Sequence, residues 1–128
     1  MAVERDRLAL PALTRAEKLT SRAARAGFDW PDAEAVLAKL TEETAELRAE
    51  LAAADADRLE DELGDMLFVL ANLARKLKLD PEAALRRANA KFTARFTSVE
   101  QVLAAHGLSP AEAGLARMEE IWQEVKKR

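Results

Sequence analysis

Apolar side chains recur every three or four residues along most of the chain, and proline and glycine, four of each, lie mostly between these periodic stretches. This spacing places apolar residues on one face of an α-helix. We predict no strand and five helices, at about 14–26, from Pro31 to about 51, at about 57–78, at about 81–105, and from Pro110 onward. Amphipathic helices joined by short turns predict an all-α antiparallel bundle of about four to five helices.

Local signals mark several of the predicted helix ends. Thr14 and Glu17 have the spacing of a capping box, and Gly27 is a plausible stop for that helix. The run 109–112 has the order of an N-cap serine, a first-turn proline and a third-position glutamate. A length of 128 residues suits one domain, and no repeat or long linker divides it. We therefore predict a single domain over 11–128 after a tail of residues 1–10.

Composition excludes several classes of function. The net charge is −3, which argues against a nucleic-acid partner, and the absence of cysteine excludes disulfides and thiolate chemistry. The longest apolar run, 66–74, is too short to cross a bilayer, and the charged N-terminal segment lacks the core of a signal peptide. We expect a cytoplasmic protein with no membrane partner.

The third predicted helix is apolar on all sides over 66–71. A helix with that pattern is central in a fold or covered by a partner. In so short a chain a second copy is the natural cover, so we predict a homodimer or a higher homo-oligomer.

Four carboxylates form two pairs on consecutive predicted helices, Glu43 with Glu46 and Glu62 with Asp65. Residues three apart share one face of a helix. With about 100° of rotation per residue, both pairs flank the apolar face of their helix, whereas Glu42 points toward solvent. Facing helices would thus gather four carboxylates around one small volume.

Such a set repels itself unless it is neutralised. Lys39 and Arg58 each lie four residues before the first carboxylate of a pair, where an ion pair could form. The second carboxylate of each pair has no basic residue three or four positions away. A hard cation such as Mg²⁺ would neutralise the set. The alternative is that these are ordinary solvated acidic faces.

The fourth predicted helix carries a basic stripe of Arg87, Lys91 and Arg95 beside its aromatic face. Lysine and arginine are suited to binding phosphate groups. Asn89 lies on the other edge of that face, and we expect it to point inward enough to form hydrogen bonds. On the last helix Trp122 is expected to be a core residue rather than a platform for a base.

The order Glu-Glu-x-x-Glu followed by Glu-x-x-Asp resembles the signature of the MazG family of all-α nucleoside triphosphate pyrophosphohydrolases. The likeness runs from Pro11 almost to the end, and is closest to the catalytic C-terminal domain of two-domain MazG proteins. The segments that carry it are Glu42–Glu46, Arg15–Leu19, Gly27–Trp30, Glu62–Asp65, Asn72–Arg75, Asn89–Phe92, Arg95–Phe96 and Met118–Trp122.

The resemblance implies hydrolysis of NTPs and dNTPs, including non-canonical ones, to the monophosphate and pyrophosphate, which clears the nucleotide pool. It implies Mg²⁺, with Mn²⁺ as a substitute. The metal ligands and catalytic residues that it implies are Glu43, Glu46, Glu62 and Asp65. The triphosphate contacts that it implies are Lys91, Arg95, Trp122 and Lys126. Arg58 stands where close relatives carry a lysine, so we also count it as a substrate-binding candidate.

The expected mechanism is attack of water between the α and β phosphates, with one of the glutamates as base, while Lys91 and Arg95 stabilise the departing pyrophosphate. Related all-α enzymes with narrower substrates stay open, including dUTPase-like, dCTPase-like and phosphoribosyl-ATP pyrophosphohydrolases. So does a non-catalytic helical dimerisation module, in which the carboxylates are surface residues.

Overall fold

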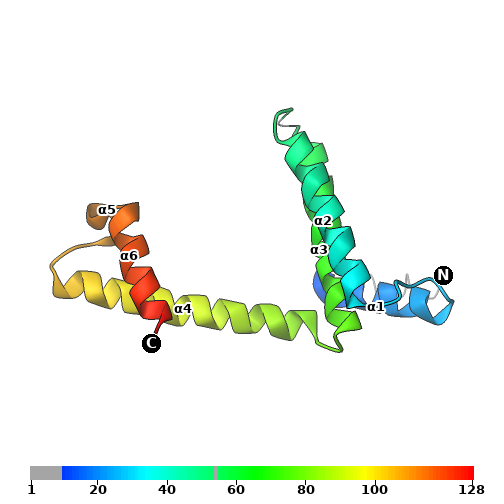
Figure 1. Ribbon diagram of the computed structural model, residues 1–128. Coiled ribbons are helices and arrows are strands. Elements are labelled where there is room, and N and C mark those ends of the chain that lie inside the picture. Colours follow the sequence, from blue (N-terminus) through cyan, green and yellow to red (C-terminus); the bar gives the residue numbers. More distant parts are fainter. Residues whose placement is uncertain (1–9, 54) are drawn as a thin grey trace. The chain divides into compact units, whose positions relative to one another are not determined.

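The computed structural model describes residues 10–53 and 55–128 and is helical throughout that part of the chain, with no strand (Figure 1). This agrees with the predicted all-α class. The predicted tail of residues 1–10 lies outside the described residues except for Leu10. The helices are α1 (Ala12–Arg25), α2 (Ala33–Glu50), α3 (Ala56–Lys76), α4 (Pro81–Ala105), α5 (Pro110–Ala113) and α6 (Leu115–Lys126).

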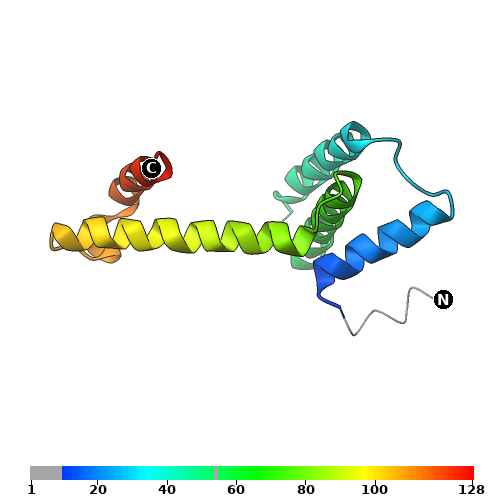
Figure 2. The same cartoon turned by 90° about the horizontal axis from the view of Figure 1, so that it is seen from below.

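The contacts group the chain into two compact units, one ending at Ala84 and the other comprising Leu85–Arg128. Each unit is therefore described by itself. In the first unit α2 and α3 form an antiparallel hairpin, and α1 packs against α3 (Figures 1 and 2). Val36 of α2 and Val69 and Ala71 of α3 are its buried apolar side chains. This hairpin places the two predicted carboxylate pairs on adjacent helices.

Two predicted starts in the first unit are wrong by a few residues. The first helix begins at Ala12 after Pro11, so Thr14 lies inside it and forms no capping box. The second begins at Ala33, because the Asp32 carboxylate caps it by accepting a hydrogen bond from the Ala35 N–H at 2.9 Å. Proline has a preset φ that suits the start of a helix, but a side-chain cap satisfies an otherwise unpaired N–H and decides the boundary.

In the second unit the later part of α4 packs against α6 around Val99, Leu103, Ile121 and Val125. The predicted capping box is confirmed: the Ser109 hydroxyl accepts from the Glu112 N–H at 3.2 Å, and Glu112 accepts from the Ser109 N–H at 3.3 Å. The predicted single helix beyond it is wrong. Gly114 has a φ of +82° and separates α5 from α6, since glycine adopts this conformation at little cost.

Several large apolar side chains of α3 are accessible. Leu63, Leu67, Phe68 and Leu70 are each between two-fifths and just over half exposed. The sequence predicted that this helix is apolar on all sides, and the first unit by itself leaves part of that surface uncovered. No helix among the described residues is both long and apolar enough to span a membrane.

Candidate functional site

Three carboxylates from the α2–α3 hairpin meet in the first unit. Glu43 of α2 and Glu62 and Asp65 of α3 each offer an oxygen atom, and these oxygens all lie within 4.8 Å of one another. Oxygen ligands of one Mg²⁺ or Ca²⁺ ion, at 2.0–2.6 Å from the metal, lie up to about 4–5 Å apart. The cluster has the dimensions of a cation site.

Glu43 is buried and Glu62 is partly buried, whereas Asp65 is exposed. Glu43 is only 6% exposed, although Lys39 approaches one of its oxygens at 3.4 Å. The other Glu43 oxygen, Oε2, and the Oε2 atom of Glu62 are buried and have no hydrogen-bond partner among the described residues. Buried carboxylate oxygens are costly unless they are paired or bind a metal. These two atoms therefore fit a hard cation.

The electrostatics point the same way. Burial raises the pKa of the Glu62 carboxyl, and the nearby Glu46, Glu43 and Asp65 carboxylates raise it further. Burial also raises the pKa of Asp65, and Glu43 and Asp61 add to this effect. Mutual repulsion of like charges favours the protonated forms. A bound cation would relieve that repulsion and favour the ionised forms instead.

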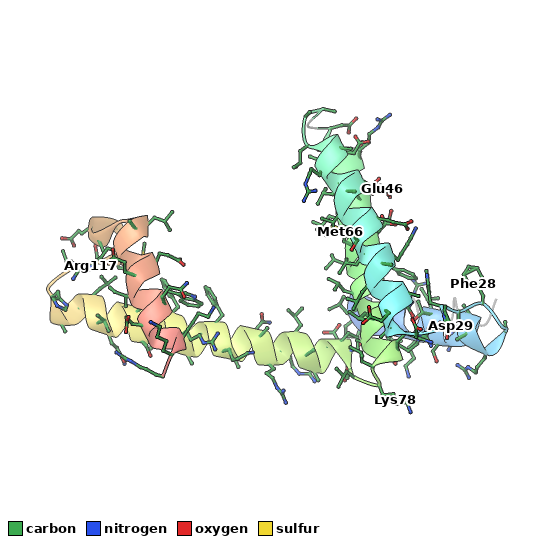
Figure 3. All side chains as sticks on the ribbon, in the orientation of Figure 1. Phe28, Asp29, Glu46, Met66, Lys78 and Arg117 are labelled. Carbon is green, nitrogen blue, oxygen red and sulfur yellow. The ribbon has the colours of Figure 1, made fainter. Side chains whose placement is uncertain are left out.

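The remaining two glutamates of the motif lie at the border of the cluster. Glu46 is exposed and lies outside the group of three, yet it is close enough to affect Glu62 (Figure 3). The Glu42 side chain is 66% exposed and pairs with Lys39 at 3.4 Å. The predicted solvent orientation of Glu42 and inward orientation of Glu43 are confirmed.

Arg58 does not take the predicted position beside Glu62. Its guanidinium lies 3.8 Å from Glu50, near the end of α2, and its side chain is 69% exposed. Spacing along α3 suggested a partner four residues away in the same helix, but the neighbouring helix of the hairpin offers Glu50 instead. The Lys39–Glu43 pair, predicted by the same rule, does form.

Two of the predicted phosphate-binding residues converge in the second unit. Arg95 of α4 and Lys126 of α6 line a pocket of about 250 Å³ together with Ser98 and Arg128. Lys91 is exposed on α4 and is not among the residues that line this pocket. Its charge is available to an anion from solvent.

Asn89 is likewise exposed, which corrects the prediction that it points inward. Its backbone carbonyl accepts a hydrogen bond from the Thr93 hydroxyl at 2.9 Å. Few side chains of α4 are buried near Asn89, because no other element of the second unit packs against this part of the helix. The apolar periodicity of the sequence, which suggested that Asn89 borders a buried face, therefore has no packed face to correspond to within this unit.

Trp122 belongs to an aromatic cluster that joins α4 and α6. Its ring centroid lies 5.6 Å from that of Phe92, which stacks on Phe96 at 5.9 Å. The indole is half-buried and lines a pocket of about 290 Å³ with apolar neighbours. It thus packs at the edge of the core and still presents a face to a ligand. Trp122 and Lys126 face different pockets.

A polar cluster that the sequence reasoning missed ties the segment before α2 to the end of α3. The Arg75 guanidinium donates to the Asp29 carboxylate, and the Lys76 ammonium donates to it at 3.3 Å and to the Trp30 carbonyl at 2.8 Å. Arg75 also lowers the pKa of Asp29 below its usual range. No spacing rule joins residues so far apart in sequence, so only the fold reveals this cluster.

Comparison with known proteins gives consistent results. A family model described as the MazG nucleotide pyrophosphohydrolase domain matches residues 32–99. The chain is 46% identical, over 93% of its length and 46% of the relative's, to a nucleoside triphosphate pyrophosphohydrolase of Escherichia coli K12. It is 41% identical, over 91% of its length and 45% of the relative's, to the nucleoside triphosphate pyrophosphohydrolase/pyrophosphatase MazG of Thermotoga maritima. The chain thus spans about half the length of these relatives.

Proposed function

Because the chain belongs to the MazG nucleotide pyrophosphohydrolase family, we propose that it hydrolyses nucleoside triphosphates to the monophosphate and pyrophosphate. The observation that carries this proposal is the pair of buried, unpartnered oxygens on Glu43 and Glu62. The names of the Escherichia coli and Thermotoga maritima relatives support the same reaction. The substrates would be NTPs and dNTPs, non-canonical ones included, in a cytoplasmic role of clearing the nucleotide pool.

We infer that Glu43, Glu62 and Asp65 hold Mg²⁺, or Mn²⁺ in its place, and that Glu46 completes the set. Carboxylate oxygens are the ligands that these hard cations prefer, and Mg²⁺ is usually held by a few carboxylates together with substrate phosphates. When bound, the ion supplies charge neutralisation and orientation to the phosphate chain. Glu46 is accessible, so it can approach the substrate side of the site without displacing a core side chain.

The reaction itself needs an attacking water and a group that takes its proton. One of the glutamates serves as this base, because an ionised carboxylate beside the water can accept its proton. Water adds to the α-phosphorus, the bond from that phosphorus to the bridging oxygen breaks, and pyrophosphate leaves with the electron pair. Lys91 and Arg95 would neutralise the charge that develops on it.

Other predicted contacts divide into two groups. Lys126 and Trp122 would bind the triphosphate chain and an adjoining apolar part of the substrate from their two separate pockets. Arg58 and Asn89 are the other proposed substrate-binding residues. Arg58 forms an ion pair with Glu50, and Asn89 is exposed.

Glu46→Ala should abolish Mg²⁺-dependent pyrophosphate release while leaving the helical circular-dichroism signal unchanged. The same loss is expected for Glu43→Gln, which keeps the shape of the buried side chain. Glu42→Ala is the matched control, because this neighbour on the same helix is exposed and should keep near-normal turnover. Undiminished pyrophosphate release by Glu46→Ala and Glu43→Gln, measured on mixed NTPs, would refute the site.

A homodimer is proposed as the assembly, and one observation favours it. The exposed apolar side chains Leu63, Leu67 and Leu70 lie on the helix that also carries two carboxylates of the site. The same surface suits the second candidate function, a helical dimerisation module without catalysis. A stoichiometric Mg²⁺ titration and pyrophosphate release together separate the two functions.

A further inference from the structure

Lys39 of α2 lies beside the carboxylate cluster. Its Nζ atom is 3.4 Å from Glu43 Oε1 and 3.4 Å from Glu42 Oε2. Residues three and four positions apart share one side of a helix, so one ammonium group reaches both carboxylates. Arg58, the other basic residue that the sequence placed near the site, pairs with Glu50 instead. Lys39 is thus the positive charge that the hairpin itself brings to Glu43.

The two partners of Lys39 differ in exposure. The Glu42 side chain is 66% exposed, whereas that of Glu43 is 8% exposed. An ion pair with an exposed partner contributes little to stability, because water and salt screen it. A buried carboxylate that loses its partner is costly, because its charge then stays buried and unpaired. The pair with Glu43 is therefore the one that stabilises the folded hairpin.

The field of this ammonium group extends to α3. Burial and the Glu43 and Asp61 carboxylates raise the pKa of Asp65, and Lys39 is the neighbour that lowers it. The charge of Lys39 thus acts on carboxylates of both helices of the hairpin. It offsets only part of their repulsion, because the pKa values of Glu62 and Asp65 stay raised.

The contact between Lys39 and Glu43 is loose. At 3.4 Å it is longer than the about 2.7–2.9 Å of a strong charge-assisted hydrogen bond. The Oε2 atoms of Glu43 and Glu62 have no hydrogen-bond partner among the described residues. Mg²⁺ binds carboxylate oxygens at about 2.0–2.1 Å and carries twice the charge of an ammonium group. A metal ion that enters the cluster would meet unpaired oxygens and a lysine that it repels.

We propose that Lys39 is the counter-ion of the carboxylate cluster in the metal-free protein and that a divalent metal ion displaces its ammonium group. The proposal rests on the proposed function, because it takes the metal to bind at Glu43, Glu62 and Asp65. The Lys39 side chain is 37% exposed, so its ammonium group can turn toward water when the metal binds. Glu43 is buried in the hairpin, so it keeps its place when the lysine leaves. Lys39 therefore lowers the affinity of the site for Mg²⁺.

The first test measures metal affinity. Lys39→Met keeps most of the length of the side chain and removes its charge. Calorimetric titration with MgCl₂ should give a Kd about tenfold lower than that of the wild type, the size of the repulsion between a single and a double charge in a water-like dielectric. Lys39→Arg keeps the charge, and Arg48→Met removes an exposed charge of the same helix, so both should bind Mg²⁺ like the wild type. An unchanged Kd in Lys39→Met would overturn the proposal, and a higher one would show that Lys39 positions Glu43 for the metal.

The second test measures thermal stability. In EDTA, Lys39→Met should melt at a lower temperature than the wild type, because Glu43 loses its counter-ion. At saturating Mg²⁺ the two melting temperatures should converge, because the metal then neutralises the cluster in both proteins. Arg48→Met should stay near the wild type in both conditions. Equal melting temperatures of wild type and Lys39→Met in EDTA would refute the counter-ion role.

The third test needs no destabilising substitution. A ¹H–¹⁵N correlation spectrum of the lysine Nζ groups reports on each ammonium of the wild type, and Lys39→Arg identifies the Lys39 signal by its loss. Addition of Mg²⁺ should move this signal toward that of a lysine in water. A signal that does not move while Mg²⁺ binds would overturn the displacement.

These measurements keep the two proposals distinguishable. Mg²⁺ binding with equal Kd in wild type and Lys39→Met would refute the role of Lys39 and leave the proposed function standing. A wild type that binds no Mg²⁺ would refute the proposed metal site and the displacement with it. The melting temperatures in EDTA would then still support or refute Lys39 as the counter-ion.

Discussion

Lys78 has a φ of +60° and is the non-glycine residue with positive φ in the described part of the chain. It ends α3 in a Schellman motif, since its N–H donates to the Arg75 carbonyl at 3.0 Å and the Leu79 N–H donates to the Ala74 carbonyl at 2.8 Å. A left-handed conformation strains any residue that has a Cβ atom. Local sequence gave no sign of this, because glycine is the usual residue there.

Lys78→Gly should therefore raise the free energy of unfolding by about 0.5–1 kcal/mol, the relief of strain less the added entropy of the unfolded chain. Urea denaturation measures the change. Lys78→Ala removes the same side chain and keeps the strain, so it should give no such gain. A gain for both variants would assign the effect to the lysine side chain instead.

The Asp29 cluster makes a prediction about pH. Arg75 and Lys76 lower the pKa of Asp29 in the folded protein, so the folded state favours the ionised form. The stabilisation is therefore present above the pKa of the unfolded chain, near 3.9, and is lost as pH falls through the lower folded value. Asp29→Asn should cost about 1–2 kcal/mol at pH 7.

The difference between wild type and Asp29→Asn should shrink steadily in acid, as urea denaturation over a pH series would show. Asp32→Asn is a suitable control, since asparagine is an equally good helix cap and should cost little at pH 7. A constant difference between wild type and Asp29→Asn down to the acid limit of folding would contradict the assignment of the stabilisation to the ionised carboxylate.

At the scale of single elements, α3 carries both mutually repelling carboxylates and residues of the core. Its first half carries Glu62 and Asp65, whose charges repel each other and those of α2, and its second half supplies the buried Val69 and Asn72. Raised pKa values mean that ionisation of these carboxylates opposes folding. The metal-free hairpin should accordingly gain stability as pH falls through the raised values.

Glu62→Gln removes one of the repelling charges and should raise the melting temperature in the absence of Mg²⁺. It should also reduce the further rise that Mg²⁺ produces in the wild type, because ligand binding stabilises only the state that binds. Thermal melts with and without Mg²⁺ test both effects. Glu60→Gln, an exposed neighbour on the same helix, is the control and should leave both melting temperatures near wild type.

Helix ends show how far local sequence determines the elements. The Ser109–Glu112 box was predicted correctly because every partner lies within four residues. The Gly114 break was missed because the apolar period continues through it, and one glycine is tolerated in many helices. The Thr14 prediction failed because the same spacing of threonine and glutamate also occurs inside helices.

At the scale of the whole molecule, the exposed apolar side chains of α3 lead to the homodimer proposal. Leu67→Glu places a charge among them and should shift the sedimentation coefficient from that of a dimer to that of a monomer. The melting temperature of the wild type should rise with protein concentration, whereas that of the variant should not. Leu51→Glu, at the exposed end of α2, is the control. A wild type that sediments as a monomer at all concentrations would refute the proposal.

Some features of the candidate site could be predicted from the sequence, and others could not. Periodicity alone separated the buried Glu43 from the exposed Glu42, because the direction of a side chain follows from rotation about one helix. It could not find the Arg58–Glu50 or Arg75–Asp29 pairs, which depend on how neighbouring elements pack.

The boundary between the two compact units falls inside α4, next to Ala84, and not in a loop. Proteases cleave extended backbone, and new segments are tolerated mainly at exposed loop tips. No exposed loop therefore separates the two units at this boundary. A cut or an inserted segment at this boundary would have to interrupt a continuous helix, so we expect the backbone next to Ala84 to resist limited proteolysis and to tolerate insertions poorly.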